Sequence, residues 1–248
     1  MPQDRAIIAQ RAKRQLDLTV DLLFAGSRLD RKIQQLDNVA RAVMDCAVDG
    51  DVIVDFCSGG GHLGIVLAHL LPRCRVIMVD NKEESVRQAR RRAAQLALPN
   101  MELIQSNLDY FKGRFNIGVA LHACGVATDL VLHSCLSKRA SFVLCPCCYG
   151  NLALDVPITY PQSRWLMERF ITVADFSILA RVADHPTDRL TGRMCMAVVD
   201  LDRIAVAAQR GYKVVLKKLQ PDSCTPKHNL LIGRALHSSD KHQSELQL

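Results

Sequence analysis

The stretch "DFCSGGGHLG" at residues 55–64 constrains the fold most, because it joins two different hydrophobic patterns. Before the glycines, "DVIVDFC" at 51–57 is a continuous β-branched and apolar run, typical of a strand buried on both faces of a parallel sheet. After them, "HLGIVLAHLL" at 62–71 has the character of an apolar helix that ends at Pro72. A strand, a glycine-rich turn and a helix in this order predict the first unit of a doubly wound α/β domain.

The chain repeats this alternation of strand and helix. Further strands are expected at 74–80, 101–107, 115–122 and 140–146, and further helices at 82–98, 126–136 and 194–210. Residues 151–165 read as an irregular excursion. The last two strands, "YKVVLKKL" and "HNLLIGRAL", are joined by "QPDSCTP", which is too short for a crossover helix, so we expect them to pair antiparallel. The predicted fold class is α/β, with a doubly wound, mostly parallel, seven-stranded sheet.

Charge and hydropathy narrow the classes of partner. The 248 residues carry 32 Lys and Arg against 25 Asp and Glu, a formal net charge of +7, which favours a polyanionic partner. Basic residues cluster at 11–14, 28–32 and 87–92, which fits an RNA-binding surface and solvated helix faces equally well. No apolar run approaches the ~20 residues of a membrane span, and the charges in residues 1–24 are too closely spaced for a secretory signal. We therefore expect a cytoplasmic protein with no membrane partner.

The glycine loop itself predicts a nucleotide-like ligand. Gly59, Gly61 and Gly64 follow a strand and open a helix, and Asp80 ends the next strand, where an acid can accept hydrogen bonds from ribose hydroxyls. Both nicotinamide dinucleotides and S-adenosylmethionine fit this pattern, and a ligand-free turn is the plain alternative. Asp55, near the end of a buried strand, needs a partner for its charge, and the methionine ammonium of S-adenosylmethionine is one. The closing antiparallel pair also favours S-adenosylmethionine over a nicotinamide cofactor.

At these residues the chain resembles the class I, Rossmann-type methyltransferases, which use S-adenosylmethionine. The segment "DFCSGGG" matches their acid-x-Gly-x-Gly-x-Gly pattern, with Cys57 in place of the first glycine. The resemblance implies that the methionine part lies beside the loop, the ribose at the acid of the second strand, and the adenine at the end of the third. The implied cofactor-binding residues are Asp55, Cys57, Gly59, Gly61, Asp80 and Asn107.

Later segments, among them "NIGVALHACGVATD", "ASFVLCPCCYG" and "VVDLDR", resemble the methyltransferase domain of the glutathione S-transferase C-terminal domain-containing proteins over about residues 35 to 235. More distantly, "HACGVATD" at 122–129 is similar to a segment of the tRNA 2'-O-ribose methyltransferases that modify the acceptor stem. Leu121 stands where that family has lysine, and "CCYG" where it has Cys-Cys-His-His. The resemblance implies an RNA acceptor, tRNA or rRNA, with protein, small-molecule and non-catalytic binding roles as alternatives.

These resemblances also indicate how the chain is divided. We expect an N-terminal helical extension at 1–34, with helices at 5–24 and from about 31 to 46. The S-adenosylmethionine-dependent methyltransferase domain is expected at 35–236 and a flexible tail at 237–248.

The ends of the fourth and fifth predicted strands carry the chemistry-bearing side chains. Because ligands of a doubly wound sheet bind outside the carboxyl ends of its strands, we expect six residues to gather around the methyl donor: His122, Cys124, Cys145, Cys147, Cys148 and Tyr149. The candidate catalytic residues are His122, Cys124, Cys147 and Tyr149. We expect His122 to orient or deprotonate the acceptor, with a pKa close to working pH. Tyr149 is expected to bind or stack on a base, or to pack.

Three roles remain open for the thiols. Thiolates and imidazole are ligands that zinc prefers, but neither C-x-C nor C-C has the two-residue gap of knuckle-type sites, so no metal is predicted. Cys147 is a candidate nucleophile that would add to a pyrimidine ring, provided that its site lowers the thiol pKa. Otherwise these thiols pack as small apolar groups.

Overall fold

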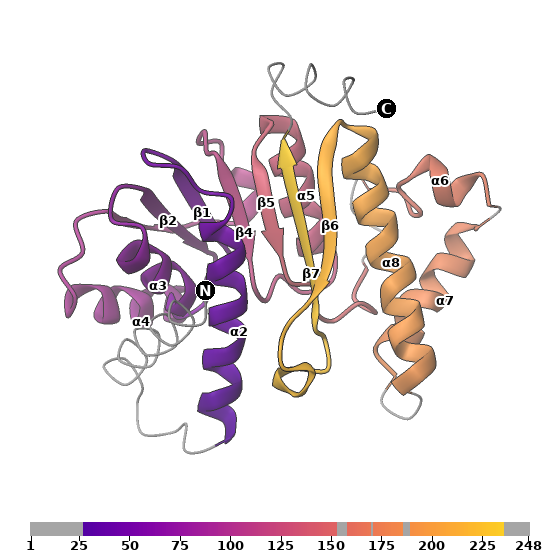
Figure 1. The fold of residues 1–248 in the computed structure, drawn as a ribbon, viewed down its shortest axis with the longest axis horizontal. Helices are drawn as coiled ribbons and strands as arrows, with labels where there is room; N and C mark the ends of the chain where they lie inside the picture. The colour runs from indigo at the N-terminus through magenta and orange to yellow at the C-terminus, as the bar shows by residue number, and fades with distance from the viewer. Residues whose placement is uncertain (1–26, 153–157, 170, 186–188, 236–248) are drawn as a thin grey trace.

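The computed structural model describes residues 27–152, 158–169, 171–185 and 189–235. These residues form an α/β fold around one seven-stranded sheet, in the order β3-β2-β1-β4-β5-β7-β6 (Figure 1). The strands are β1 (Val52–Phe56), β2 (Arg75–Asp80), β3 (Met101–Gln105), β4 (Ile117–Ala120), β5 (Ser141–Leu144), β6 (Tyr212–Lys218) and β7 (Asn229–Ala235). The predicted fold class is confirmed.

Strand direction follows from the connections. The pairs β1–β2, β2–β3, β1–β4 and β4–β5 are parallel, and each is linked through a helix or a long connection. β7 lies antiparallel to both β5 and β6. The short connection between β6 and β7 leaves no room for a crossover, which explains the second of these pairs. Every residue of β4 is buried, and so are the last four of β1, which explains their continuous apolar sequence.

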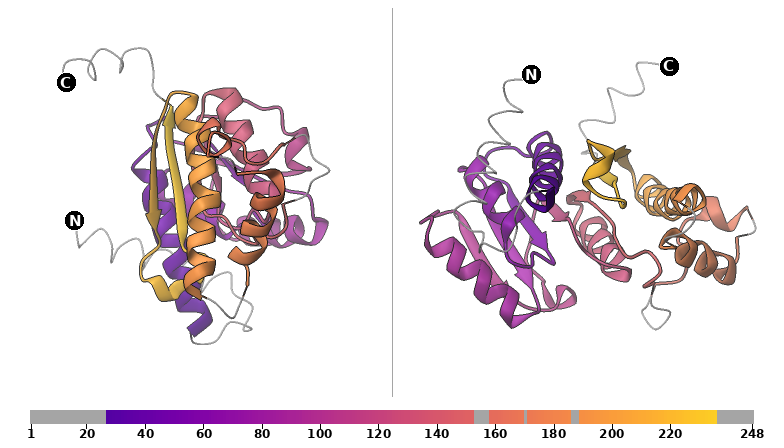
Figure 2. Two further views of the ribbon diagram at one scale, coloured as in Figure 1. Left: turned by 90° about the vertical axis from the view of Figure 1, so that its right-hand side faces the viewer. Right: turned by 90° about the horizontal axis from the view of Figure 1, so that it is seen from below.

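Helices cover both faces of the sheet (Figures 1 and 2). Their bounds are α2 (Ser27–Met44), α3 (His62–Leu70), α4 (Glu83–Ala94), α5 (Val126–Lys138), α6 (Arg164–Met167), α7 (Val173–Ala183) and α8 (Arg189–Gln209), with 3-10 turns η1 (Leu108–Tyr110) and η2 (Asp222–Cys224). α2 and α3 bury Leu36 and Leu67 against one face of the central strands. α5 and α8 bury Leu132 and Val206 against the other. The core is therefore two apolar layers separated by the sheet.

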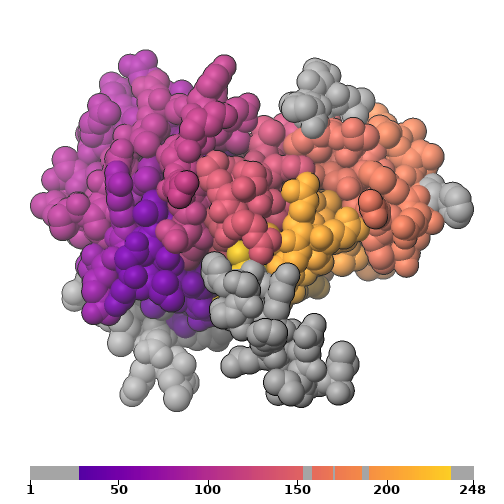
Figure 3. All heavy atoms as spheres, turned by 90° about the horizontal axis from the view of Figure 1, so that it is seen from above, coloured from indigo at the N-terminus to yellow at the C-terminus, as the bar shows by residue number. Residues whose placement is uncertain are grey.

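A third apolar cluster lies beyond the sheet, where α6 and α7 pack on α8. It includes Tyr160, Phe176 and Val199, and Figure 3 shows this end of the molecule opposite the end formed by β1–β3 and α4. The sequence predicts no helix in 166–193, so α7 is a correction. Its signal is local: the side chain and backbone of Thr172 exchange hydrogen bonds with Asp175 in a capping box that begins the helix.

Some expectations fall on residues outside the described ranges, namely the helix at 5–24 and the tail at 237–248. The helix expected from about residue 31 is α2, which begins at Ser27, runs through the predicted boundary at residue 34 and buries Ile33 and Val39 in the core. No helix in the described part of the chain is long and apolar enough to cross a membrane.

Candidate functional site

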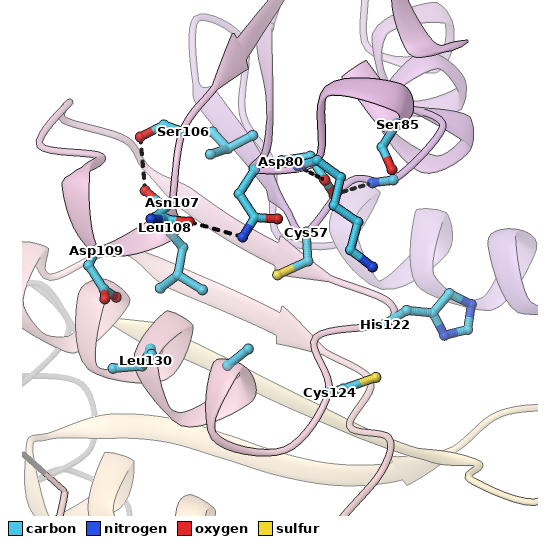
Figure 4. A pocket seen from close by; sticks show the side chains of 15 residues that line it. Cys57, Asp80, Ser85, Ser106, Asn107, Leu108, Asp109, His122, Cys124 and Leu130 are labelled. Atoms are coloured by element: carbon cyan, nitrogen blue, oxygen red, sulfur yellow. Dashed lines mark hydrogen bonds between the residues drawn. The ribbon is translucent and has the colours of Figure 1, made fainter. Parts of the chain in front are cut away.

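A cavity of about 480 Å³ opens outside the carboxyl ends of β1, β2 and β4 (Figure 4). This volume lies in the range of small-molecule sites, and the position is where doubly wound sheets bind ligands. Six residues predicted from the sequence line it: Cys57, Gly59, Asp80, Asn107, His122 and Cys124. Six further polar or loop residues that the sequence analysis does not single out also line it: Asn81, Lys82, Ser85, Ser106, Leu108 and Asp109.

The glycines of the loop have different roles. Gly59 has a φ of +53°, and a Cβ there would meet nothing within 4 Å, so its backbone lies open to the cavity. Gly61 has a φ of +79°, and a Cβ there would lie 2.9 Å from the Cβ of Ala89 on α4. Gly61 therefore lets the loop pack against α4 and does not line the cavity, although the sequence predicts a ligand contact for it.

Asp80 is the best-defined polar group of the cavity. Its Oδ2 accepts the Gly59 N–H at 2.8 Å, and its Oδ1 accepts the Lys82 N–H at 2.9 Å. Both oxygens are thereby fixed, and each keeps a lone pair for another donor. Two adjacent hydroxyl groups of a ribose are donors of that kind, so the geometry fits the role predicted for Asp80.

Asn107 lies across the cavity from the glycine loop, after β3. Its Oδ1 accepts a hydrogen bond from Asn81 Nδ2 at 2.9 Å (Figure 4). The amide orientation is therefore set by a neighbour on the next loop, and its own amide hydrogens remain as donors.

Cys57 occupies the position that holds glycine in the family pattern. Its φ of +54° lies in the left-handed region, which residues with a Cβ seldom adopt. Its side chain points into the cavity (Figure 4). Burial, followed by the charge of Asp80, raises the pKa of the Cys57 thiol to about 12. The cavity wall therefore has a neutral thiol here.

Asp55 does not line the cavity. Its side chain is 1% exposed, and its Oδ2 accepts the Gly64 N–H at 3.0 Å. Burial raises the pKa of Asp55 to about 7, although the Gly64 hydrogen bond and the charge of Lys32 oppose the shift. Lys32, on α2, was missed by the sequence analysis, because only the fold brings this helix next to β1. Burial lowers the pKa of Lys32, and Asp55 partly offsets that effect.

His122 follows β4 and is exposed at the cavity, as predicted. The predicted pKa needs correction. The cavity walls displace part of the water around the exposed ring, and the charge of Lys32 acts in the same direction, so the pKa of His122 is lowered to about 4. The imidazole is therefore neutral at physiological pH, and can donate one hydrogen bond and accept another.

The predicted thiol cluster forms in part. Cys124, in the loop after β4, lies with its Sγ 2.9 Å from the Sγ of Cys147, which follows β5. The sulfur of Cys148 joins them, so that all three lie within 4.8 Å of one another. Cys145 is buried elsewhere, with its Sγ 3.7 Å from the Lys227 carbonyl oxygen. Burial and then Cys124 raise the pKa of Cys147, which disfavours a free thiolate nucleophile.

Tyr149 lies away from the cavity, and the predicted contact with a base is corrected. Its side chain is completely buried, and its hydroxyl donates to Asp200 at 2.6 Å. Of the two readings offered by the sequence, the structure supports packing.

Tyr149 belongs to a buried ionic network that the sequence analysis missed. Arg203 of α8 donates from Nε and Nη2 to the two oxygens of Asp129 on α5, at 2.9 and 2.8 Å, and from Nη1 to Asp200 at 2.9 Å. Tyr160 donates to Asp129 at 2.9 Å. Asp129 ends the "HACGVATD" segment, and Arg203 ends "VVDLDR". These two segments thus hold α5 and α8 together.

Solved structures support the class of protein that the fold and cavity define. Magnesium protoporphyrin IX methyltransferase from Synechocystis PCC 6803, crystallised with S-adenosylhomocysteine, superposes with a TM-score of 0.51 over 91% of this chain and 93% of its own, at 17% identity. The same enzyme with S-adenosylmethionine gives 0.51 over 93% of this chain and 97% of its own, at 16% identity. At such identities the likeness concerns the fold, which is that of a Rossmann-like methyltransferase.

Sequence comparison identifies the family to which the chain belongs. A family model described as a methyltransferase domain matches residues 31–155, and the chain belongs to this methyltransferase domain family. The glutathione S-transferase C-terminal domain-containing protein of Bos taurus is 49% identical over 216 residues, 85% of this chain and 34% of the relative. The Drosophila melanogaster homolog is 48% identical over 217 residues, 84% of this chain and 37% of the relative. The chain thus spans about a third of the length of these curated relatives.

The chain thus carries a methyltransferase domain, and the methyl donor that such a domain implies is S-adenosylmethionine. The cavity fits that donor. Asp80 offers fixed acceptors for the ribose, Gly59 permits close approach of the ligand, and Asn107 offers amide hydrogens at the end predicted for the adenine.

Proposed function

We propose that this methyltransferase acts on RNA, with tRNA as the first candidate. The rim of the donor cavity carries the proposal. Leu108 and Asp109 line the cavity, and the next residue, Tyr110, is 73% exposed. Lys112 and Arg114 follow it on the surface. An exposed aromatic ring beside two cations is the pattern that stacks on bases and contacts phosphates.

A second basic surface adjoins the opposite wall of the cavity. Lys82 is exposed and lines the cavity at the start of α4, and Arg87, Arg90 and Arg91 are exposed along that helix. Cations on both sides of one opening suit a polyanion that passes across it. The formal net charge of +7 would raise the rate of encounter with such a partner.

The chemistry asked of the protein is mainly positioning. S-adenosylmethionine supplies a methyl group on a sulfonium, which an acceptor atom displaces in line, so alignment of the two reactants gives most of the acceleration. Asp80 and Asn107 fix the donor in this proposal. His122, neutral and exposed at the cavity, orients the acceptor through a hydrogen bond. A cytoplasmic location is part of the proposal, since all ten cysteines are free thiols, as in a reducing compartment.

The test is methyl transfer from radiolabelled S-adenosylmethionine to separated pools of tRNA, rRNA, protein and small metabolites. We expect label in the tRNA pool, and much less label with Asp80→Asn when the donor concentration lies below the wild-type Kd. Label in protein or metabolites alone would overturn the RNA proposal. Donor binding without label in any pool would favour a non-catalytic role.

A charge-reversal pair sharpens the test. Lys112→Glu with Arg114→Glu should raise the KM for RNA about tenfold and reduce its salt dependence, because two phosphate contacts are lost. The affinity for S-adenosylhomocysteine should not change. The matched control reverses Lys213 and Lys217 on β6, which are exposed at the far edge of the sheet. If both pairs behave alike, general charge and not the cavity rim determines RNA binding.

A further inference from the structure

The three thiols that meet at the ends of β4 and β5 have the geometry of a metal site. Cys124 comes from the loop before α5, and Cys147 and Cys148 come from the turn after β5. Zinc binds thiolate sulfur at ~2.3 Å, so two sulfur ligands of one ion can lie at most ~4.6 Å apart. The three Sγ atoms lie within 4.8 Å of one another, close to that limit. They can therefore ligate one ion after small side-chain rotations.

The backbone holds the two loops together without help from the thiols. The Gly125 N–H donates to the Cys147 carbonyl oxygen at 3.1 Å, beside a parallel bridge between Cys124 and Cys147. A Cβ on Gly125 would lie 2.1 Å from the carbonyl oxygen of Asn151, so only glycine permits this approach. The thiols are thus placed in advance by main-chain contacts, as a binding site requires.

Cys148 shows local strain at the same point. Its φ is +50°, in the left-handed region that a residue with a Cβ seldom adopts. Strain of this kind tends to occur at functional sites, where it serves to aim a side chain. Here it accompanies the approach of the Cys148 sulfur to the other two.

We propose that Cys124, Cys147 and Cys148 bind one Zn²⁺ ion as three thiolates, and that its fourth coordination position faces the donor cavity. The three thiols release their protons to solvent as the ion binds, and no electron transfer is involved. Cys124 is the link to the cavity because it also lines the cavity wall. Three protein ligands with one open position is the arrangement of catalytic rather than structural zinc sites. Water, or an atom of the acceptor, would take the open position.

The positions of these cysteines in the fold explain why their spacing in the sequence does not reveal a metal site. Cys124 and Cys147 are 23 residues apart, in the loops that follow β4 and β5. The gap expected within a zinc knuckle therefore does not apply, because the pair is formed by loops that leave two neighbouring parallel strands.

The test measures metal directly. The full chain, purified under reducing conditions without chelator, should contain about one equivalent of zinc by mass spectrometry. Stripped protein should bind Co²⁺ with thiolate-to-metal charge-transfer absorption and release it to Zn²⁺. Each of Cys124→Ser, Cys147→Ser and Cys148→Ser should weaken Zn²⁺ binding at least a hundredfold. Cys57→Ser, which also alters a thiol of the same cavity, should leave it unchanged.

The outcomes separate this proposal from the RNA proposal, because none of these measurements requires methyl transfer. Wild-type protein that binds no zinc after full reduction would overturn it, and so would binding of Cu⁺ alone. Undiminished zinc in the three variants would equally overturn it. Circular dichroism and S-adenosylhomocysteine affinity of each variant report whether it is folded, and the wild-type metal content tests the site even if a variant does not fold.

Discussion

Asp55 and Asp129 are both buried acids, but they lie in regions of opposite character. Asp129 is in the network between α5 and α8, where it accepts hydrogen bonds from Arg203, Tyr160 and Gln162. Among the described residues, Asp55 accepts one hydrogen bond, from the Gly64 amide, and its pKa is raised to about 7. One region satisfies its charges and stabilises the fold. The other leaves an acid with unused acceptor capacity buried behind the glycine loop, where its pKa is raised.

The largest effect on stability is expected in the buried ionic network between α5 and α8. Arg203→Met leaves Asp129 and Asp200 buried without their cation, which should lower the free energy of unfolding by about 3–5 kcal/mol. Urea denaturation followed by circular dichroism measures this. Arg75→Met removes an exposed ion pair with Glu102 and should cost at most about 1 kcal/mol. Equal losses in the two variants would show that the network is not specially stabilising.

At Asp55 the comparison predicts a dependence of stability on pH. A carboxyl whose pKa is raised on folding binds its proton more tightly in the folded state. Its stabilising contribution is complete below about pH 4, where the unfolded carboxyl is also protonated, and is lost as pH rises through about 7. Asp55→Asn should therefore be more stable than wild type at pH 8, with a difference that grows by roughly 1.4 kcal/mol per pH unit between 5 and 7. A constant difference across this range would contradict the raised pKa.

The contact between Asp80 and the ribose of the methyl donor should affect ligand binding more than the stability of the fold. In Asp80→Asn an amide nitrogen replaces one acceptor oxygen, which should weaken S-adenosylhomocysteine binding about 10- to 100-fold, or roughly 1.5–3 kcal/mol for a hydrogen bond to a charged group. Calorimetric titration gives the affinity, and NADH serves as the parallel ligand that should not bind. Asn107→Ala should have a smaller effect. Unchanged affinity in Asp80→Asn would place the ribose elsewhere.

The smallest expected effect distinguishes packing from catalysis at Tyr149. Tyr149→Phe removes one donor from Asp200, which keeps Arg203 and Asn229, and should cost about 1–2 kcal/mol of stability. The kcat and KM for RNA should not change at a temperature where the variant is folded. A loss of kcat without a loss of stability would restore the catalytic role that the sequence predicted.

The sequence predicts local features of this molecule well. Continuous apolar runs identify β1, β4 and β5. The short connection after β6 predicts that β6 and β7 pair antiparallel. Both features depend only on residues that are adjacent in the sequence. The glycine loop likewise predicts that a ligand cavity opens at the carboxyl end of β1. α7 was missed even though its capping box is local.

Long-range partners were not predictable from one sequence. Asp129 and Arg203 are separated by 74 residues, and no periodicity relates them. Lys32 approaches Asp55 only because α2 packs beside the sheet. The low pKa of His122 likewise comes from surroundings assembled by the fold. Such contacts decide which acids are structural and which remain available to a ligand.

The two tyrosines of the buried network have a consequence for how such a domain diversifies. Tyr149 is held by Asp200, and Tyr160 by Asp129, so the chain is fixed at both of these points. Cys148, directly before the first of these anchors, is one of the three clustered thiols. Substitutions between the two tyrosines leave both anchors unchanged, together with the network to which they belong. Relatives of this chain should therefore differ more in sequence between the two tyrosines than at the tyrosines themselves.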